Sequence, residues 1–443
     1  MGDGPRKLCR YPFSGGFGGR PMNGFRIAAA ALLGIAVALA APGPARADAV
    51  AERMLGAYRA WTAKHKLKRS SVAIIRDGHI VGSDKSGATS PLKPEPVASV
   101  SKVITGICIV KLVEAGRLQY DAPLGAVLAG YFARYGRPAD RRFSSITVAQ
   151  LLTQTSGIGD ANIDQHKLSL AEQMRDTIKL RLFQDPGGKH QYENKNFQVL
   201  GLIVEQVTGQ PYEEACRRLV LEPAGAGAAH ISLVQPFMSS WAGWIISARD
   251  MALFMRHFEP RFGLLKTGPR DWPKVDLGDR WFYSVGTRLR HNEDDSYSAV
   301  HSGVWTWGSS TLNYQFMARF VYWGSGIGFA MNASPSIDGL GEDLEHEMWK
   351  ASLPVEAELP RPAPQAKLDY STNRPGNDYR SFILTREMKG DVCRKACEDE
   401  PQCKAYTLER PSLPQQPNSV CHLKNPAPAL AVRDFCCASQ VLR

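Results

Sequence analysis

The sequence predicts an α+β fold, an α/β sandwich in which an antiparallel sheet is flanked by helices beside a helical subdomain, followed by a small disulfide-rich domain. Two observations predict this division. Strand-like segments lie near both ends of residues 48–355 with helical stretches between them, and six of the nine cysteines fall in residues 369–443. A chain of 443 residues with 44% hydrophobic content has enough apolar side chains for more than one core.

The first 47 residues are predicted to be a secretory signal peptide. A basic residue precedes the uncharged stretch Ile27–Ala41, and small residues follow as far as Ala47, after which we expect cleavage. The uncharged stretch is shorter than the roughly 20 residues that a membrane-spanning helix needs. We therefore expect a periplasmic or secreted mature protein without a transmembrane segment, and Met22 is an alternative to Met1 as the translated start.

Three strand-like segments predict the sheet, namely Ser71–Arg76, Arg319–Trp323 and Ile327–Asn332. The glycine-rich residues 324–326 join the last two segments as a hairpin. Because the first segment comes before the helical stretches and the other two come after them, we expect an antiparallel sheet that is flanked by a helical part.

Ser99-Val100-Ser101-Lys102 opens the first helical stretch. Apolar residues follow at helical spacing without a proline, which places Ser99 at a helix N-terminus with Lys102 one turn later on the same face. The helix dipole favours negative charge at that end, and a buried lysine loses proton affinity and can act as a base. A second serine with the same spacing to a lysine, Ser90, lies among prolines that prevent a helix.

Tyr192-Glu193-Asn194 precedes the second helical stretch, Phe197–Gly209, which ends at a glycine. This order places Tyr192 on the loop before the helix, where a nearby cation would make its phenolate accessible as a base for Ser99. The amide of Asn194 could donate to a substrate carbonyl. The residues alone leave open whether Lys102 or Tyr192 takes the serine proton.

His301-Ser302-Gly303 is the third motif, and it precedes the predicted strands near residue 320. The three motifs together supply a nucleophile, two candidate bases and a strand for an oxyanion hole, which are the parts that acyl transfer requires. They predict a serine hydrolase that forms an acyl-enzyme on Ser99, and this chemistry needs no metal or organic cofactor.

Further segments carry a family resemblance. The sequence resembles the serine β-lactamase and penicillin-binding protein superfamily, specifically its class C β-lactamase-like branch. The resemblance rests on the three motifs and on the segments Leu112–Leu118, Ile146–Ile158 and Trp244–Met251. Carboxypeptidases, D-aminopeptidases and esterases belong to this branch. The resemblance implies a β-lactamase/transpeptidase-like fold and a set of site residues. These are the catalytic Ser99, Lys102 and Tyr192, the pocket residues Asn194, His301 and Gly303, and an oxyanion hole from the N–H groups of Ser99 and Val304.

Two positions depart from the family pattern. Gln154 stands where the family usually has histidine, at a position that is more often structural than catalytic. His301 stands where true class C β-lactamases carry lysine, which can hold a substrate carboxylate, whereas an unperturbed histidine is mostly uncharged at pH 7. We therefore expect a small ester, amide or peptide substrate, including D-amino-acid peptides, and we favour a true β-lactamase less.

Residues 356–368 are predicted to be a stiff proline-rich linker. Six cysteines follow the linker within a short segment, which predicts a disulfide framework in a small secreted domain. They are Cys393, Cys397, Cys403, Cys421, Cys436 and Cys437. A zinc site at Cys421 and His422 is the alternative, and the predicted signal peptide argues against it because it implies an oxidising compartment. Cys108 and Cys216 lie in helical stretches of the first domain, where we expect buried, unpaired thiols.

Residues 369–443 resemble a PAN/apple domain, on the marks Asn373–Tyr379, Ala405–Thr407 and Cys421–Lys424. This resemblance implies disulfides Cys393–Cys421 and Cys397–Cys403, leaves Cys436 and Cys437 unassigned, and implies a module that binds a protein or carbohydrate.

The net charge of +11 includes six basic residues and one acidic residue of the predicted leader, so the mature chain has only a mild positive excess. No basic run with interleaved aromatic residues is present in the sequence, which argues against nucleic acid as a partner. The sequence also leaves open a second function, in which the protein has a catalytically idle penicillin-binding fold and binds envelope polymers or proteins through the PAN-like domain.

Overall fold

A computed structural model describes residues 48–161, 163–309, 312–336, 341–354, 364–365, 368–384, 391–409 and 418–443. The predicted leader of residues 1–47 and most of the predicted linker lie outside these ranges. Within them, no helix is both long enough and apolar enough to span a bilayer.

The larger sheet has eight strands in the order β2-β1-β11-β10-β9-β8-β7-β6, and its neighbouring strands are antiparallel. The strands are β1 (Arg69–Arg76), β2 (His79–Gly87), β6 (Val275–Gly278), β7 (Trp281–Ser284), β8 (Thr287–His291), β9 (Tyr297–Ser309), β10 (Leu312–Tyr322) and β11 (Ile327–Ser334). The strand pair from the start of the domain joins the strands from its end, which confirms the predicted α+β fold.

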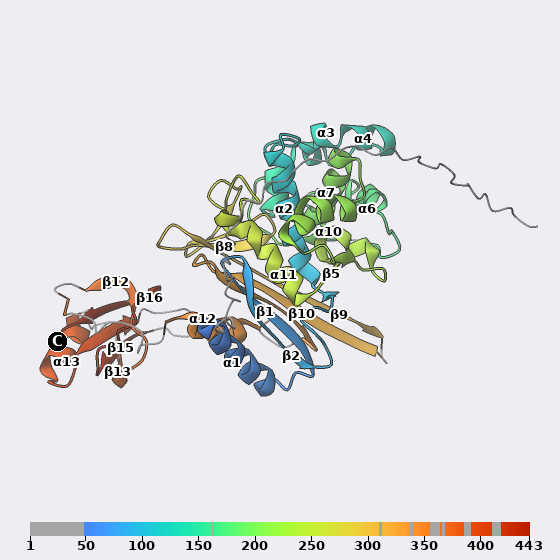
Figure 1. The fold of residues 1–443 in the computed structure, drawn as a ribbon. Coiled ribbons are helices and arrows are strands. Elements are labelled where there is room, and N and C mark those ends of the chain that lie inside the picture. The colour runs from blue at the N-terminus through green and yellow to red at the C-terminus, as the bar shows by residue number, and fades with distance from the viewer. Residues whose placement is uncertain are drawn as a thin grey trace, which may run out of the picture. The chain divides into compact units, whose positions relative to one another are not determined.

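Both faces of this sheet are covered, as the burial of β1 shows. Ala73 and Ile75 point into the core that the sheet shares with the helical region, and Val72 and Ile74 point into a second core on the other face. Helices α1 (Ala49–Lys64) and α12 (Glu342–Ser352) close that second core, and Figure 1 shows them on the opposite side of the strands from α2 and α11. β1 is therefore an almost continuously buried strand, as its apolar sequence requires.

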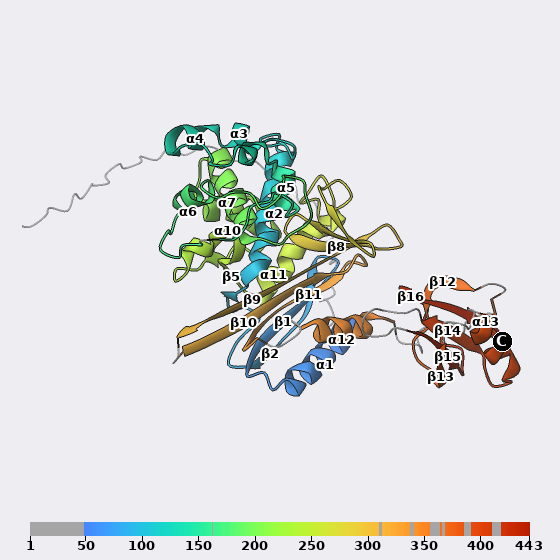
Figure 2. The ribbon, with the colours of Figure 1, turned by 180° about the vertical axis from the view of Figure 1, so that it is seen from behind.

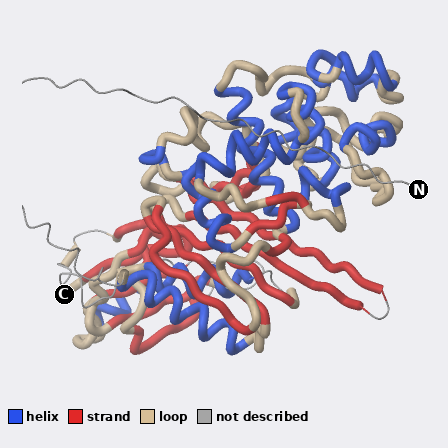
Figure 3. Tube along the Cα trace, turned by 45° about the vertical axis from the view of Figure 1, so that its right-hand side comes forward, coloured by secondary structure: helices blue, strands red, loops and turns tan. Residues whose placement is uncertain are grey.

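The helical region follows β2 in the chain, and Figures 2 and 3 show its helices gathered beside the strands of the large sheet. Its helices are α2 (Ser101–Glu114), α3 (Leu124–Val127), α4 (Ala129–Tyr135), α5 (Val148–Leu152), α6 (Leu170–Thr177), α7 (Asn194–Thr208), α8 (Tyr212–Cys216), α9 (Glu222–Ala224), α10 (Ser239–Ala242) and α11 (Ala248–Phe254). A small sheet in the order β3-β5-β4 adds β3 (Glu95–Pro96), β4 (His230–Ile231) and β5 (Trp244–Ile246). α2 is buried at every position from Ser101 to Val110, so it is the central helix of this region.

The C-terminal residues form a separate five-stranded sheet in the order β12-β16-β14-β15-β13. Its elements are β12 (Asp369–Asn373), β13 (Asp378–Leu384), α13 (Asp391–Asp399), β14 (Ala405–Glu409), β15 (Ser419–Lys424) and β16 (Val432–Val441). This arrangement agrees with the predicted small disulfide-rich domain.

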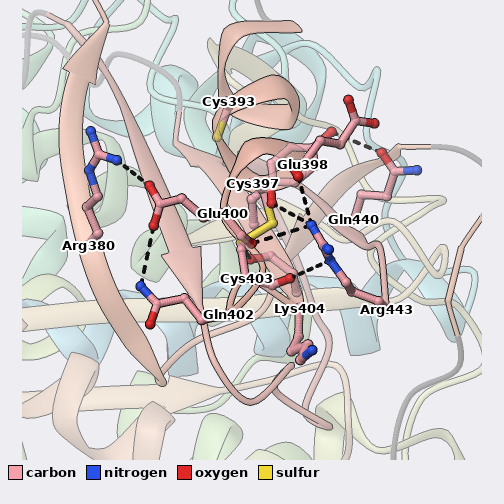
Figure 4. Close-up of a disulfide and its surroundings, with 12 residues drawn as sticks. Arg380, Cys393, Cys397, Glu398, Glu400, Gln402, Cys403, Lys404, Gln440 and Arg443 are labelled. Carbon is pink, nitrogen blue, oxygen red and sulfur yellow. Dashed lines mark hydrogen bonds and ion pairs between the residues drawn. A yellow bond between two sulfur atoms is a disulfide. The ribbon is translucent and has the colours of Figure 1, made fainter.

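Two disulfides hold the only helix described in this domain. Cys393 bonds Cys421 with a Cα–Cα distance of 5.6 Å, and Cys397 bonds Cys403 at 5.2 Å, which are the two pairs that the PAN resemblance implies. Figure 4 shows Arg443 beside the second disulfide, where its guanidinium donates to the carbonyl oxygens of Cys397 and Cys403 at 3.0 Å each. Cys437 is also disulfide-bonded, and the side chain of Cys436 lies outside the described part of the chain.

The turn between β7 and β8 packs directly against the backbone of α2. A Cβ atom on Gly106 would lie 1.9 Å from the carbonyl oxygen of Val285, and one on Gly286 would lie 2.2 Å from the carbonyl oxygen of Lys102. Gly286 also has a φ of +81°, which a residue with a Cβ rarely adopts. The two glycines therefore set how closely the sheet approaches α2, the helix that carries Lys102 and directly follows Ser99.

This contact predicts opposite effects for two helical glycines. Gly106→Ala should lower the free energy of unfolding by about 1–3 kcal/mol, because the added methyl meets a backbone carbonyl that cannot move aside alone. Gly56→Ala in α1 is the matched control, since nothing lies within 4 Å of its added methyl, and it should stabilise by roughly 0.5–1 kcal/mol. Urea unfolding of the full chain measures both variants. An unchanged stability of Gly106→Ala would contradict the close approach.

Candidate active site

Ser99 lies in a single 3₁₀ turn, η1 (Ala98–Val100), that leads directly into α2. The preceding residue, Ala98, has a φ of +45°, a conformation that is uncommon for a residue other than glycine. The sharp turn leaves Ser99 partly exposed while both its neighbours are buried. The predicted position of Ser99 at the start of a helix therefore agrees with the structure.

Lys102 lies one turn after Ser99 and is fully buried. Its Nζ atom donates to Ser99 Oγ at 3.1 Å, to Asn194 Oδ1 at 2.7 Å and to the carbonyl oxygen of Trp241 at 3.0 Å. Burial lowers the pKa of Lys102 to about 7, and the negative charge of Asp160 acts in the opposite direction. Near pH 7 a large share of this lysine is therefore the neutral amine, hydrogen-bonded to the serine hydroxyl.

Asp160 is a residue of the site that the sequence motifs did not reveal. Its carboxylate accepts from the backbone N–H groups of Asn194 and Lys195, at 2.8 Å each, and from Asn194 Nδ2 at 2.7 Å. It therefore caps the N-terminus of α7 and orients the Asn194 amide so that Oδ1 faces Lys102. Asp160 lies 34 residues before Asn194 in the chain, so no local spacing could have linked the two.

The contacts of Asn194 differ in part from the prediction that its amide donates to a substrate carbonyl. Its carbonyl oxygen accepts from Lys102, and its NH₂ group already donates to Asp160, so its principal contacts are within the protein. Gln154 supports the same loop, because its Oε1 atom accepts from the N–H of Glu193 at 3.0 Å. This contact fits the structural role expected at the position of Gln154.

Tyr192 lies on the loop before α7, as the sequence predicts. Lys102 Nζ lies 4.9 Å from the centroid of its ring, and the ring meets Tyr283 edge to face at 6.0 Å. Burial around the hydroxyl raises the pKa of Tyr192 well above its usual value, which the interaction with Ser99 only partly offsets. The residue as a whole is 41% exposed, but the pKa responds to the packing around the hydroxyl. Tyr192 is therefore a neutral phenol near pH 7, and the nearby Lys102 does not make its phenolate readily accessible.

The third motif lies where one edge of β9 becomes free of strand pairing. β8 pairs with β9 only as far as Val300, and just beyond that point the turn η1 packs against β9 at Gly303. A Cβ atom on Gly303 would lie 2.0 Å from the carbonyl oxygen of Val97 and 2.9 Å from the backbone nitrogen of Ser99. Glycine at this position is what allows the strand to touch the nucleophile's turn.

Backbone N–H and C=O groups point to opposite edges at successive residues of β9, which decides where the N–H of Val304 points. The carbonyl oxygen of Val300 accepts from Thr287 Oγ1 of β8 at 3.0 Å, so the polar groups of Val300 point toward the β8 edge. Successive residues of a strand alternate in this direction, and the register of β9 with β10 shows no shift between Val300 and Val304. The N–H of Val304 therefore points to the same edge of β9, beyond the last residue that pairs with β8.

His301 is buried, with 8% of its surface exposed. Burial, together with the nearby charge of Lys102, lowers its pKa to about 3, so it is neutral at physiological pH. Its Nδ1 atom lies 2.7 Å from the carbonyl oxygen of Ser302, and because a carbonyl can only accept, Nδ1 carries the proton and Nε2 is left as an acceptor. Burial therefore removes even the small charged fraction that an unperturbed histidine would carry at pH 7.

A cavity of about 550 Å³ adjoins Asn194 and Trp241. Its lining residues are Ile163, Asp164, Gln165, His166, Asn194, Gln235, Phe237, Trp241 and Trp305. Three of these form an aromatic series, since Trp241 meets both Phe237 and Trp305 edge to face at 6.2 Å. Lys102 Nζ lies 5.6 Å from the ring of Trp241, so the cavity lies next to the nucleophile. Among the described residues, no group of three or more His, Cys, Asp or Glu is placed to hold a metal ion.

Comparisons with known proteins agree with this arrangement. The "Protein flp" of Staphylococcus aureus (strain COL) is 28% identical over 173 residues, which are 36% of this chain and 34% of that protein. The chain thus spans about a third of the length of the curated relatives it matches first.

Solved structures share the fold at low identity. A β-lactamase/D-alanine carboxypeptidase from Pseudomonas syringae matches with a TM-score of 0.55 at 14% identity, over 69% of this chain and 100% of that one. A D-stereospecific amidohydrolase from Streptomyces sp. matches with a TM-score of 0.52 at 16% identity, over 68% and 98% of the two chains.

Two family models match the sequence itself. The Beta-lactamase model matches residues 47–338, and the PAN domain model matches residues 372–424. The first match covers well over half of the chain and contains all three motifs. On these matches, the chain belongs to the Beta-lactamase family of serine hydrolase-like proteins and carries a PAN domain in its C-terminal part.

Proposed function

We propose that this protein is a secreted or periplasmic serine hydrolase that forms an acyl-enzyme on Ser99 with esters or amides that lack a carboxylate near the reacting bond. The observation that carries the proposal is the buried Lys102 amine, which has a lowered pKa and lies 3.1 Å from Ser99 Oγ. A catalytic base works best when its pKa is close to the working pH, and this pair meets that condition.

Lys102 rather than Tyr192 is the proposed base for acylation. A neutral Lys102 can take the proton of Ser99 as the serine oxygen attacks the substrate carbonyl carbon. The ammonium formed then keeps its contacts with Asn194 Oδ1 and the Trp241 carbonyl and faces the charge of Asp160. Tyr192 holds its proton at neutral pH, so we assign it the relay of a proton from Lys102 to the leaving group.

The oxyanion would be bound by two backbone N–H groups. Those of Ser99 and Val304 lie on facing backbone segments that touch at Gly303, and preorganised donors of this kind stabilise the tetrahedral intermediate. Collapse of the intermediate breaks the bond to the leaving group, which takes up the relayed proton, and leaves the acyl group on Ser99. Water then attacks the acyl carbonyl carbon while the neutral Lys102 accepts its proton. The bond to Ser99 Oγ breaks as that oxygen takes the proton back from Lys102, which releases the acid and restores the free enzyme.

The neutral state of His301 supports a substrate that lacks a carboxylate near the reacting bond. A lysine at this place would offer a permanent charge to a substrate carboxylate, whereas His301 offers a neutral ring with Nε2 as an acceptor. The aromatic series of Phe237, Trp241 and Trp305 beside the nucleophile suits an apolar acyl group. Esters, amides and D-amino-acid peptides whose carboxylate lies away from the scissile bond are therefore proposed ahead of penicillins, in keeping with the amidohydrolase among the structural neighbours.

The PAN domain is proposed to bind a protein or a carbohydrate of the cell envelope. Its disulfides favour an oxidising compartment, in agreement with the predicted leader. The alternative of an idle penicillin-binding fold that acts only through this domain is less well supported, because Ser99, Lys102 and Tyr192 form an intact constellation.

Covalent labelling tests the nucleophile. Intact-mass spectrometry after exposure to a fluorophosphonate should find one adduct, at Ser99, and Ser99→Ala should abolish both the adduct and ester turnover while remaining folded by circular dichroism. Ser90→Ala is the matched control, because Ser90 has the same spacing to a lysine, and it should label like the wild type. Turnover of simple esters should exceed that of penicillins. Labelling that persists in Ser99→Ala would refute the assignment.

Asp160 tests the base. Its charge raises the pKa of Lys102, so Asp160→Asn should lower that pKa further and move the midpoint of the kcat/KM–pH profile to lower pH by about one unit. The wild-type profile should rise with pH through a midpoint near 7, because only the neutral amine accepts the proton.

The control is Asp164→Asn on the same loop, whose carboxylate bonds the N–H of His166 at 2.9 Å. It should leave the midpoint unchanged. A folded Asp160→Asn variant whose midpoint stays in place or moves to higher pH would show that Lys102 is not the titrating base.

A further inference from the structure

Two buried thiols in the helical region have no part in the proposed chemistry. Cys108 lies in the middle of α2 and Cys216 is the last residue of α8, and neither is exposed to solvent. Both are reduced in this structure. They come from segments far apart in the sequence, on two helices that pack together.

The packing of α2 against α8 brings the two thiols together. Thr105 Oγ1 and Tyr212 OH lie 2.6 Å apart across the contact. Cys108 follows Thr105 by three residues and Cys216 follows Tyr212 by four, so each cysteine lies one turn further along the same helix face. The two thiols interact with each other, and both lie close enough to the Tyr212 hydroxyl to affect its pKa.

At the proposed secreted or periplasmic location, the chain meets an oxidant when it folds. Cys393–Cys421 and Cys397–Cys403 are disulfides, and such bonds form and persist mainly in oxidising surroundings. In the folded state, burial and the neighbouring Cys108 thiol raise the pKa of Cys216 far above its usual value, which makes the packed dithiol a poor nucleophile. Oxidation would therefore take place before α2 and α8 close on each other, in the same surroundings that oxidise the C-terminal pairs.

We propose that Cys108 and Cys216 form a further disulfide, which ties α2, the helix that carries Lys102, to α8. One thiolate attacks a sulfur of an oxidised dithiol carrier or of glutathione disulfide, which gives a mixed disulfide and releases one carrier thiol. The second thiolate then displaces the other carrier thiol. Two electrons pass to the carrier, and the two protons that the cysteine thiols lose are taken up by the carrier thiols.

The cross-link would enclose the loops of the active site. The closed ring of about 100 residues contains Asp160, Tyr192 and Asn194. A ring of this length restricts the unfolded chain strongly, so the bond should stabilise the helical region without touching the reacting groups.

Peptide mapping of the full chain tests the bond directly. The protein is folded in a glutathione redox buffer, acid-quenched, denatured, blocked with iodoacetamide without reduction, and digested. We expect a linked peptide pair that contains Cys108 and Cys216 and that separates on reduction. In the control variant Cys216→Ala, Cys108 should be carbamidomethylated. Carbamidomethylation of both residues in the oxidatively folded wild type would overturn the proposal.

Thermal unfolding supplies an independent readout. Reduction should lower the Tm of the first unfolding transition of the wild type by about 5 °C more than it lowers that of the double variant Cys108→Ala/Cys216→Ala. The double variant keeps the C-terminal disulfides, so the change in its Tm on reduction measures their effect alone. Any packing defect from the lost sulfur atoms is present both before and after reduction, so it does not alter that change. Equal losses in the two proteins would count against the bond.

Discussion

The burial of one lysine amine against one serine hydroxyl is the constraint on which the rest of this structure depends. A charged amine in a dry site is costly unless oxygen acceptors surround it. Lys102 meets three such oxygens, from Ser99, Asn194 and the backbone of Trp241, and each comes from a different segment. The lysine is thus held in place whether or not it carries its proton, and this lets it exchange a proton near neutral pH.

Positioning these three oxygens requires backbone segments to approach one another unusually closely. The turn at Gly286 packs closely against the backbone carbonyl of Lys102, and β9 packs closely against the backbone of Ser99 at Gly303. Side chains at either glycine would separate the sheet from α2 and pull the nucleophile away from its base. The large sheet therefore acts as the support that sets the geometry of the catalytic helix.

Much of this could be predicted from the sequence, because the signals were local. The helical spacing after Ser99, the apolar strands near residues 72 and 330 and the cysteine density of residues 369–443 predicted the α+β fold and the small domain, and the structure and the family models confirm them. The order of the motifs also indicated which residues would meet, since Ser99, Lys102 and Tyr192 lie together.

What the sequence could not supply depends on packing between distant segments. Asp160 reaches α7 from a loop with no recognisable spacing, and the Trp241 contact uses a backbone carbonyl that any residue could offer. The charge states of His301 and Tyr192 follow from burial, which no motif encodes: His301 loses the small charged fraction of an unperturbed histidine, and Tyr192 keeps its proton. The role of each residue in catalysis stays a proposal.

Direct titration of Lys102 tests the central claim most sharply. The protein can be labelled with ¹³Cε-lysine, and the Lys102 resonance assigned by its loss in Lys102→Gln. Its chemical shift should show a single inflection near pH 7, because burial lowers the pKa of Lys102 to about 7. An inflection near the ordinary lysine value of 10.5 would show that the amine is charged at working pH and that Lys102 is not the base.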